Sequence, residues 1–218
     1  MIDQGIVQGR DWGSKCLRDL FINGIDSKLP TLFMLHGTGG TEHDLVSIAK
    51  YISPASSILS VRGNILENGM PRFFKRLAEG VFDEEDLTLR TRELRDYLNE
   101  ASVKYSFDRN NVVAIGYSNG ANIAASMLFQ YENVLRGAVL HHPMVPIRGR
   151  DLPKMTSFPV FIGAGKNDPI CLPAETVELS EILSVAGADV TIHWEQNGHQ
   201  LTHSEVEAAQ FWFSEKFK

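Results

Sequence analysis

The stretch from residue 112 to residue 128 constrains the fold of this chain more than any other. Residues 112–115 (Val-Val-Ala-Ile) are apolar and mostly β-branched, which predicts a buried strand. Residues 116–120 (Gly-Tyr-Ser-Asn-Gly) follow, and small and apolar residues then recur at helical spacing as far as Leu128. A strand, a tight turn centred on serine and a helix packed against that strand together form a nucleophile elbow.

The residue types at this turn suit that geometry. A serine between the strand and the helix takes up a strained backbone conformation, and Gly116 and Gly120 let the two elements approach closely. The helix begins directly after Ser118, so its unpaired N–H groups face any negative charge that develops there. G-x-S-x-G alone occurs by chance, and an ordinary turn with a capping serine is the alternative. The strand before it and the helix after it favour Ser118 as a nucleophile.

Length and composition indicate one globular domain over residues 1–218. The chain is 43% hydrophobic and 22% charged, which is ordinary for a soluble protein. Its net charge of −6, without a basic patch, argues against a nucleic-acid partner. Since no apolar run approaches the roughly 20 residues that cross a bilayer, we expect no membrane partner either.

Cysteine usage and the N-terminus indicate a cytoplasmic protein. Cys16 and Cys171 are far apart and lack metal-ligand spacing, which is typical of reduced thiols rather than of a disulfide framework. Residues 1–5 lack the basic and apolar regions of a signal peptide. Residues 1–17 have little periodicity, so we expect them to form a frayed or loosely packed extension.

Strands alternate with helices along the rest of the chain. We expect strands at 20–22, 31–35, 57–61, 112–115, 137–140, 159–163 and 190–194, and helices at 44–51, 83–105, 119–128, 173–186 and 203–217. The first strand would lie at a sheet edge, and Thr41 and Asp83 would cap the first two helices. This order predicts an α/β fold, with a mostly parallel, doubly wound sheet, helices on both faces and no separate cap domain. Sites in such sheets form at the carboxyl ends of strands.

A serine nucleophile needs a base within hydrogen-bonding distance, and histidine is the usual choice. His199 is the best placed of the seven histidines, because it follows the last strand in a flexible Asn-Gly-His turn. The rivals are His141 and His142 at the end of another strand, although such a pair more often lines a site. The remaining histidines have structural interpretations, either bracing a glycine-rich turn (His36), near helix starts (His43, His203) or along a strand (His193).

The base in turn needs an acid that fixes its tautomer. Asp168 lies in a turn after the strand at 159–163, from which a carboxylate can reach across the sheet edge to His199. Its alternative is a turn-forming aspartate before a proline, and Glu195 and Asp189 are weaker rivals. The chain order Ser, Asp, His is that of α/β-hydrolases.

Attack on a carbonyl creates an oxyanion, which backbone N–H groups can stabilise. The residue after the nucleophile, Asn119, supplies one such group, and the loop after an early strand supplies the second. That loop is His-Gly-Thr-Gly-Gly at 36–40, where Thr38 is the expected donor. The loop lacks the Gly-Lys-Ser/Thr ending of a phosphate-binding P-loop.

The long stretch 62–81 is the only obvious material for a substrate wall. A loop of that length inside a compact domain usually has a function. We expect Met70, Phe73 and Phe74 to form an acyl or aromatic pocket wall, with burial of both phenylalanines in the core as the alternative. Arg62 and Arg72 in the same stretch could bind an anionic substrate group, although exposed arginines are usually just solvated.

The chain resembles the α/β-hydrolase superfamily from about Leu20 to its end, and within it the small carboxylesterase/phospholipase family of bacteria. The segments LHGTGGTEHDL, SVRGNILENGMPRFFKRLAEGVFDEEDL and AIGYSNGANIAASMLF are similar to its branch linked with methylhydroquinone resistance. This resemblance implies a triad and an oxyanion hole formed by Ser118, Asp168, His199 and the amides of Thr38 and Asn119. It also implies a homodimer, because family members are often dimers.

Three classes of function stay open. The first is a serine hydrolase that cleaves small to medium carboxylic esters through an acyl-enzyme, without cofactor or metal. The second is a thioesterase, a lysophospholipase or a carbon–carbon bond hydrolase; the resemblance suggests quinone-derived ring-cleavage products as substrates. The third is a non-catalytic binding protein of the same fold, which is disfavoured because all three triad residues are present. Cys171 is expected to be a bystander near Asp168.

Overall fold

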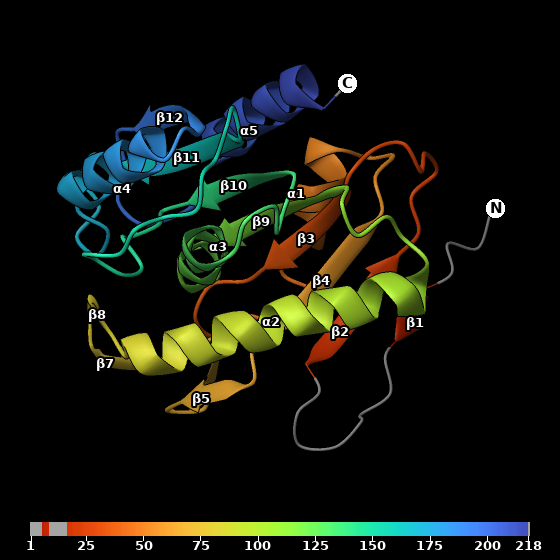
Figure 1. Cartoon of the computed structure of the whole chain (residues 1–218), viewed down its shortest axis with the longest axis horizontal. Helices are drawn as coiled ribbons and strands as arrows, with labels where there is room; N and C mark the ends of the chain where they lie inside the picture. Colours follow the sequence, from red (N-terminus) through yellow and green to blue (C-terminus); the bar gives the residue numbers. More distant parts are fainter. Residues whose placement is uncertain (1–5, 9–16, 218) are drawn as a thin grey trace.

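The computed structural model describes residues 6–8 and 17–217, in which strands and helices alternate over most of the chain (Figure 1). In chain order the elements are β1 (Ile6–Gln8), β2 (Arg18–Ile22), β3 (Thr31–Leu35), α1 (Val46–Ile52), β4 (Ile58–Arg62), β5 (Ile65–Glu67), β6 (Met70–Arg72), β7 (Arg76–Ala78), β8 (Val81–Phe82), α2 (Glu84–Tyr105), β9 (Val112–Tyr117), α3 (Asn119–Gln130), β10 (Gly137–His141), β11 (Pro159–Gly165), α4 (Pro173–Val185), β12 (Asp189–Glu195) and α5 (His203–Lys216).

The predicted, mostly parallel sheet is confirmed. Its eight strands lie in the order β1-β2-β4-β3-β9-β10-β11-β12. Every neighbouring pair from β4 to β12 is parallel, whereas β2 pairs antiparallel with both β1 and β4. Because β3, β9, β10, β11 and β12 run in one direction, the loops that follow them meet at one edge of the sheet.

Helices cover both faces of this sheet, as the alternation of elements predicted (Figure 1). In β9, Val112 and Ala114 point into a core that contains residues of α2, α3 and α4. Val113 and Ile115 point into the opposite core, which contains residues of α1 and α5. All four side chains are fully buried, because a strand covered on both faces has no solvent-exposed side.

The long helix α2 begins as predicted, whereas α1 does not. Asp83 caps α2 by accepting a hydrogen bond from the Asp86 backbone N–H at 3.0 Å. The predicted cap of α1 at Thr41 is wrong, because the Thr41 hydroxyl donates to the Asp44 carboxylate at 2.6 Å. Turns fill the residues after Thr41, and the regular helix starts only at Val46.

The stretch 62–81 is not an irregular loop but two β-hairpins, β5–β6 and β7–β8. The first turns at Asn68-Gly69, where both residues have positive φ (50° and 81°). Two successive residues with positive φ fit a tight hairpin turn, and Asn-Gly is the residue pair that favours it. The local signal for this hairpin was therefore present in the sequence.

The expected edge strand β2 is not at the edge. Residues 6–8, which we expected to belong to a loose extension, form β1 and pair with β2 in the register Val7 to Phe21. A three-residue strand is too short to show a period in the sequence. The rest of that extension, residues 1–5 and 9–16, lies outside the described residues.

The described part of the chain contains no separate cap domain. Nor does any helix among these residues have the length and apolar character needed to span a bilayer.

Candidate active site

Ser118 occupies the turn between β9 and α3 in a backbone conformation with positive φ, at φ 52° and ψ −114°. A positive φ is uncommon for a residue other than glycine and marks local strain. The flanking glycines make this turn possible. A Cβ atom at Gly120 would overlap the backbone oxygen of Leu35, and one at Gly116 would overlap the backbone of the helix start. The Ser118 N–H donates to the backbone oxygen of His141 at 2.8 Å, which anchors the turn to β10.

The predicted serine, histidine and aspartate come together at the carboxyl edge of the sheet. Ser118 follows β9, Asp168 follows β11 and His199 follows β12. The His199 Nε2 atom lies 2.8 Å from the Ser118 Oγ atom, and its Nδ1 atom lies 2.8 Å from the Asp168 Oδ2 atom. This arrangement orients the imidazole to accept a proton from the serine while the carboxylate holds the other ring nitrogen.

The Asp168 carboxylate is held in its ionised form. It is buried, and burial alone would raise its pKa. The backbone N–H groups of Cys171 and Ile170 donate to its Oδ1 atom at 2.9 and 2.8 Å, while His199 and His142 bind Oδ2. These hydrogen bonds outweigh burial and lower the pKa of Asp168 below its usual value.

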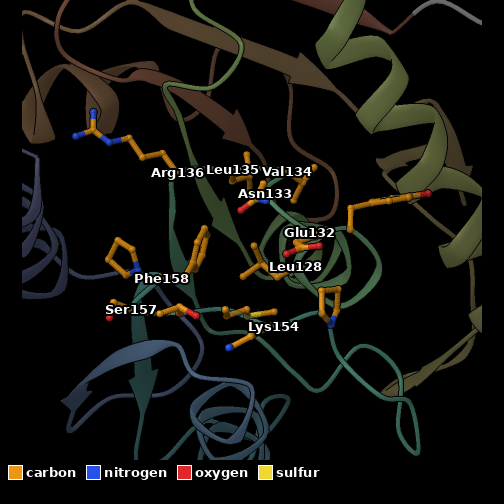
Figure 2. A pocket seen from close by; sticks show the side chains of 14 residues that line it. Leu128, Glu132, Asn133, Val134, Leu135, Arg136, Lys154, Ser157 and Phe158 are labelled. Carbon is orange, nitrogen blue, oxygen red and sulfur yellow. The ribbon is translucent and has the colours of Figure 1, made fainter.

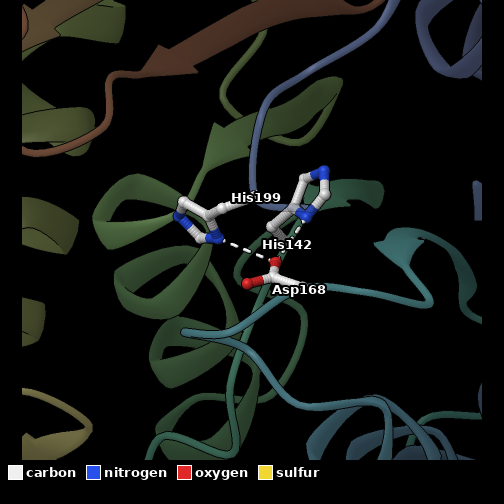
Figure 3. Close-up of side chains that lie close together, drawn as sticks. All are labelled: His142, Asp168 and His199. Carbon is white, nitrogen blue, oxygen red and sulfur yellow. Dashed lines mark hydrogen bonds and ion pairs between the residues drawn. The ribbon is translucent and has the colours of Figure 1, made fainter. Parts of the chain in front are cut away.

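The rival base His142 lies behind this carboxylate, away from the serine. Its Nδ1 atom is 2.8 Å from the Asp168 Oδ2 atom (Figure 3). Its Nε2 atom is 3.1 Å from the Glu205 Oε2 atom. His141 binds the other oxygen of Glu205 through Nδ1 at 2.5 Å. Both histidines are 1% exposed, and neither forms a hydrogen bond to the Ser118 side chain.

Glu205, in the first turn of α5, is the residue of this network that the sequence did not reveal. It is fully buried, and burial alone would raise its pKa, but hydrogen bonds from His141 and His142 lower the pKa to about 2. Gly163 in β11 makes room for it, since a Cβ atom there would overlap the Glu205 carboxylate. The only sequence signal was this glycine within an otherwise apolar strand.

His142, Asp168 and His199 lie close enough to share a metal ion. However, the Nδ1 atoms of both rings lie at hydrogen-bonding distance from the same Asp168 oxygen. An N–H group that donates to a carboxylate has no lone pair left for a metal. We therefore attribute this cluster to hydrogen bonding.

Two further interactions that involve histidines hold parts of the site in place without contacting the reacting atoms. His36 is buried; its Nδ1 atom lies 2.6 Å from the Gly37 oxygen and its Nε2 atom accepts from the Gly63 N–H at 3.0 Å, so it braces the glycine-rich loop as expected. Tyr117, which we had not singled out, donates its hydroxyl to the backbone oxygen of His199 at 2.8 Å. Its aromatic ring also lies against the His199 ring.

The proposed oxyanion residues are held in place by three consecutive residues, 71–73. The Pro71 oxygen accepts from the Gly39 N–H at 2.8 Å, next to Thr38. Arg72 donates from Nη1 to the Thr38 Oγ1 atom at 2.7 Å. The Phe73 N–H donates to the Asn119 Oδ1 atom at 2.7 Å. Asn119 is the first residue of α3, where backbone N–H groups lack partners within the helix.

A cavity of about 280 Å³ opens onto the serine. Thr38, Ser118, Asn119 and His199 line it, together with apolar side chains and two arginines. The apolar residues are Phe82, Met144 and Ile170, and the arginines are Arg72 and Arg76. A concave site that combines apolar surface with polar groups suits a small molecule.

The substrate wall is therefore not the one we expected. Phe73 and Phe74 are 3% and 0% exposed, belong to the hydrophobic core and do not line the cavity. The hairpin geometry turns them inward, where Phe73 packs on His36 and Phe74 on Phe82. Met70 lies on the β5–β6 hairpin, 42% exposed and likewise outside the cavity lining.

Cys171 lines the same cavity but is an unsuitable nucleophile. Burial, with the Asp168 charge adding to it, raises the pKa of its thiol well above the usual range. The thiol donates to the backbone oxygen of His142 at 3.1 Å. Arg62, by contrast, pairs with Glu42 and does not reach the cavity.

A second cavity, of about 270 Å³, lies at the opposite edge of the sheet (Figure 2). The end of α3 and the starts of β10 and β11 surround it, through residues that include Leu128, Arg136, Lys154 and Phe158. Its lining contains neither histidine nor cysteine.

A mostly parallel sheet whose central strand ends in a strained serine turn, with a carboxylate and a histidine after two later strands, defines an α/β-hydrolase. The chain belongs to the phospholipase/carboxylesterase family, whose model matches residues 20–215. Its family and its similarity to known relatives identify it as an esterase-type hydrolase. It is 59% identical to MhqD of Bacillus subtilis (strain 168) over 184 residues, 84% of this chain and 92% of that protein.

A solved structure of a Bacillus cereus carboxylesterase is equally similar in sequence. It is 59% identical, superimposes with a TM-score of 0.92, and the match covers 94% of this chain and 96% of that one. A more distant relative is acyl-protein thioesterase 1 of Cryptococcus neoformans var. neoformans serotype D. It is 27% identical over 175 residues, 71% of this chain and 72% of that protein.

Proposed function

We propose that the chain is a serine carboxylesterase that cleaves small to medium esters through an acyl-enzyme intermediate. The observation that carries this proposal is the continuous hydrogen-bonded path from Ser118 through His199 to Asp168, with 2.8 Å at both steps. A serine hydroxyl becomes nucleophilic when a base removes its proton as it attacks. The cavity of about 280 Å³ beside that serine supports a substrate at the small end of the usual range.

In this mechanism the Ser118 Oγ atom attacks the ester carbonyl carbon while its proton passes to the His199 Nε2 atom. The negative charge that develops on the carbonyl oxygen is stabilised by the backbone N–H groups of Thr38 and Asn119. The tetrahedral intermediate collapses, and the leaving alcohol takes the proton from His199. Asp168 keeps the imidazole in the required tautomer and stabilises its charged form.

The second half of the reaction repeats these steps with water. His199 removes a proton from the water molecule, the hydroxyl attacks the acyl-enzyme carbonyl, and the carboxylic acid leaves as Ser118 regains its proton. Each bond that forms in these steps is matched by one that breaks.

A thioesterase is the second candidate, because the chain is similar to acyl-protein thioesterase 1. The same triad and oxyanion hole serve a thioester, which differs only in the leaving group. A lysophospholipase is supported only by the description of the family, which names phospholipases. A carbon–carbon bond hydrolase and a non-catalytic binding protein have no specific observation in their favour. A homodimer and a cytoplasmic location stay predictions.

The proposal is tested by covalent labelling and hydrolysis together. A fluorophosphonate probe should add to wild type once, at Ser118, as read by intact mass and peptide mapping. The Ser118→Ala variant should not be labelled and should lose at least about four orders of magnitude in turnover of 4-nitrophenyl acetate. Esters and thioesters of matched acyl groups then separate the two candidates. An unlabelled wild-type protein would instead support the binding protein.

A further inference from the structure

Two arginines stand on one wall of the Ser118 cavity. Arg72 ends β6 and Arg76 begins β7, so the two neighbouring hairpins each contribute one guanidinium group. Their side chains are 4% and 27% exposed, respectively. Both pair with the same carboxylate, Glu67, at 3.2 Å from Arg72 Nη1 and at 2.9 Å from Arg76 Nε. One carboxylate therefore serves two positive charges, and it does not itself line the cavity.

Arg72 has a structural explanation that needs no ligand. Its Nε atom donates to the Phe74 oxygen at 3.2 Å, and its Nη1 atom donates to Thr38 and contacts Glu67. These bonds attach the hairpin to the oxyanion loop. Burial, with the nearby charge of Arg76, lowers the pKa of Arg72, while Glu67 opposes that shift.

Arg76 has no comparable structural role. Its hydrogen bonds to the described residues all run from Nε to Glu67, at 2.9 and 3.1 Å. The two terminal nitrogens of Arg76 therefore form no hydrogen bond to the described residues. Together they make the fork with which a guanidinium binds a carboxylate through two parallel hydrogen bonds. Because this side chain lines the serine cavity, that fork is available to a bound substrate.

The other groups around the cavity fit a ligand with one anionic end. Phe82, Met144 and Ile170 provide apolar surface for its carbon skeleton. Glu79 is the only acidic residue in the cavity lining, and it lies in the exposed turn of the β7–β8 hairpin. The two arginines and Glu67 together carry one net positive charge, which the exposed carboxylate of Glu79 offsets from the solvent side.

We infer that the substrate of this site is an ester that carries a free carboxylate, which Arg76 binds with Arg72 behind it while Ser118 attacks the ester carbonyl. The inference rests on the proposed esterase function and adds the chemical class of its substrate. Arg76 acts on specificity, since it touches the carboxylate and not the reacting atoms.

Matched ester pairs that differ only in one carboxylate test this inference. On the acyl side the pair is 4-nitrophenyl hydrogen adipate and 4-nitrophenyl hexanoate. On the alcohol side it is 4-acetoxybenzoate and its methyl ester. Wild type should favour the carboxylate member of at least one pair by about tenfold or more in kcat/KM, the scale expected of a charge-assisted hydrogen bond.

Substitutions at Arg76 and at its partner Glu67 should change the preference for carboxylate esters in opposite directions. Arg76→Gln should abolish it, because it should lower kcat/KM far more for the carboxylate member of a pair than for the neutral member, and Arg76→Lys should keep part of it. Glu67→Gln should increase it, because it removes the competing carboxylate. Arg150→Gln is the matched control, since Arg150 is exposed and lies outside the cavity lining. Circular dichroism should show the same fold for all variants.

The outcomes separate this inference from the proposed function. Equal hydrolysis of charged and neutral esters by wild type overturns the inference and leaves the esterase standing. So does an Arg76→Gln variant that slows both members of a pair alike. If wild type hydrolyses none of the four esters and Ser118 takes up no fluorophosphonate, both fail.

Discussion

His142 and His199 bind the same oxygen atom of Asp168, each through Nδ1 at 2.8 Å. The two rings approach from different sides, and only His199 continues to the serine. His142 continues instead to Glu205, which binds His141 in turn. The candidate triad is therefore one end of a longer buried chain of alternating histidines and carboxylates.

The position of His142 between two carboxylates predicts a pH-dependent stability. Burial alone would lower the pKa of His142, but its hydrogen bonds and charge interactions with Glu205 and Asp168 raise it above the usual value. A raised pKa in the folded state contributes stability that is fully present below about pH 6.5, the unfolded value. This stability is lost as the pH rises through the folded pKa.

His142→Asn tests this, because asparagine tolerates the positive φ of 53° at this position. It leaves a buried carboxylate pair without its cation, so we expect a loss of about 3 kcal/mol in the free energy of unfolding at pH 6. Urea titrations should show the difference between wild type and variant shrinking from pH 6 to pH 9. His203→Asn, at an exposed histidine, is the control. A difference that stays constant over this range contradicts a charged His142.

The lowered pKa of Glu205 predicts how the free energy of unfolding changes in acid. Its pKa in the folded state is about 2, below the usual value of 4.5 for a glutamate. A lowered pKa contributes stability that is present above the unfolded value and is lost as the pH falls through the folded one. Wild type should therefore lose roughly 3 kcal/mol of unfolding free energy between pH 5 and pH 2 through this group. The Glu205→Gln variant should start less stable at pH 7 and show a shallower decline, measured by urea unfolding.

Substitutions of His142 and His199, the two histidines that share Asp168, should also differ in their effect on catalysis. His199→Ala removes the group 2.8 Å from Ser118 Oγ, so turnover of 4-nitrophenyl acetate should fall by about four orders of magnitude. His142→Ala leaves Asp168 held by two backbone N–H groups and by His199, so we expect a loss of about tenfold. Assayed side by side at pH 7, equal losses would make His142 a second essential group.

The sequence singled out the three residues of the candidate triad but not the buried network of histidines and a carboxylate behind them, for a physical reason. Ser118, Asp168 and His199 each follow a parallel strand, and the topology of such sheets brings these turns together. Glu205 lies in a helix, and its partners His141 and His142 end a strand some sixty residues earlier. No local pattern connects those positions, because only the packing of α5 against the sheet creates the contact.

The prediction of an aromatic substrate wall was wrong for a different reason. Phe73 and Phe74 follow β6 directly, and both are buried in the core. The sequence shows that these residues are aromatic but not which way the chain turns after the hairpin. Composition suggested an aromatic wall, whereas the pairing of Ile65 with Arg72 places an arginine there.

The contact between Arg72 and Thr38 predicts a role in positioning. Replacing Arg72 with glutamine removes the 2.7 Å hydrogen bond that holds the Thr38 side chain, so the amide at Thr38 should be less well aligned. Since losing one oxyanion donor costs about 10² to 10³ in kcat, we expect a misaligned donor to cost about tenfold. The loss should appear in kcat for neutral esters with KM nearly unchanged. A change confined to KM contradicts this role.

Gly163 provides the most direct test of the buried network. A Cβ atom at this position in β11 would overlap the Glu205 carboxylate, which has no free space because it is fully buried between His141 and His142. Gly163→Ala should therefore destabilise the protein by about 3 kcal/mol, through overpacking and displacement of the carboxylate. Shortening the partner relieves the overlap, so Gly163→Ala should cost much less in a Glu205→Ala background. Urea unfolding of the two single variants and the double variant gives this coupling. Additive losses would mean that Glu205 does not depend on the space that Gly163 leaves.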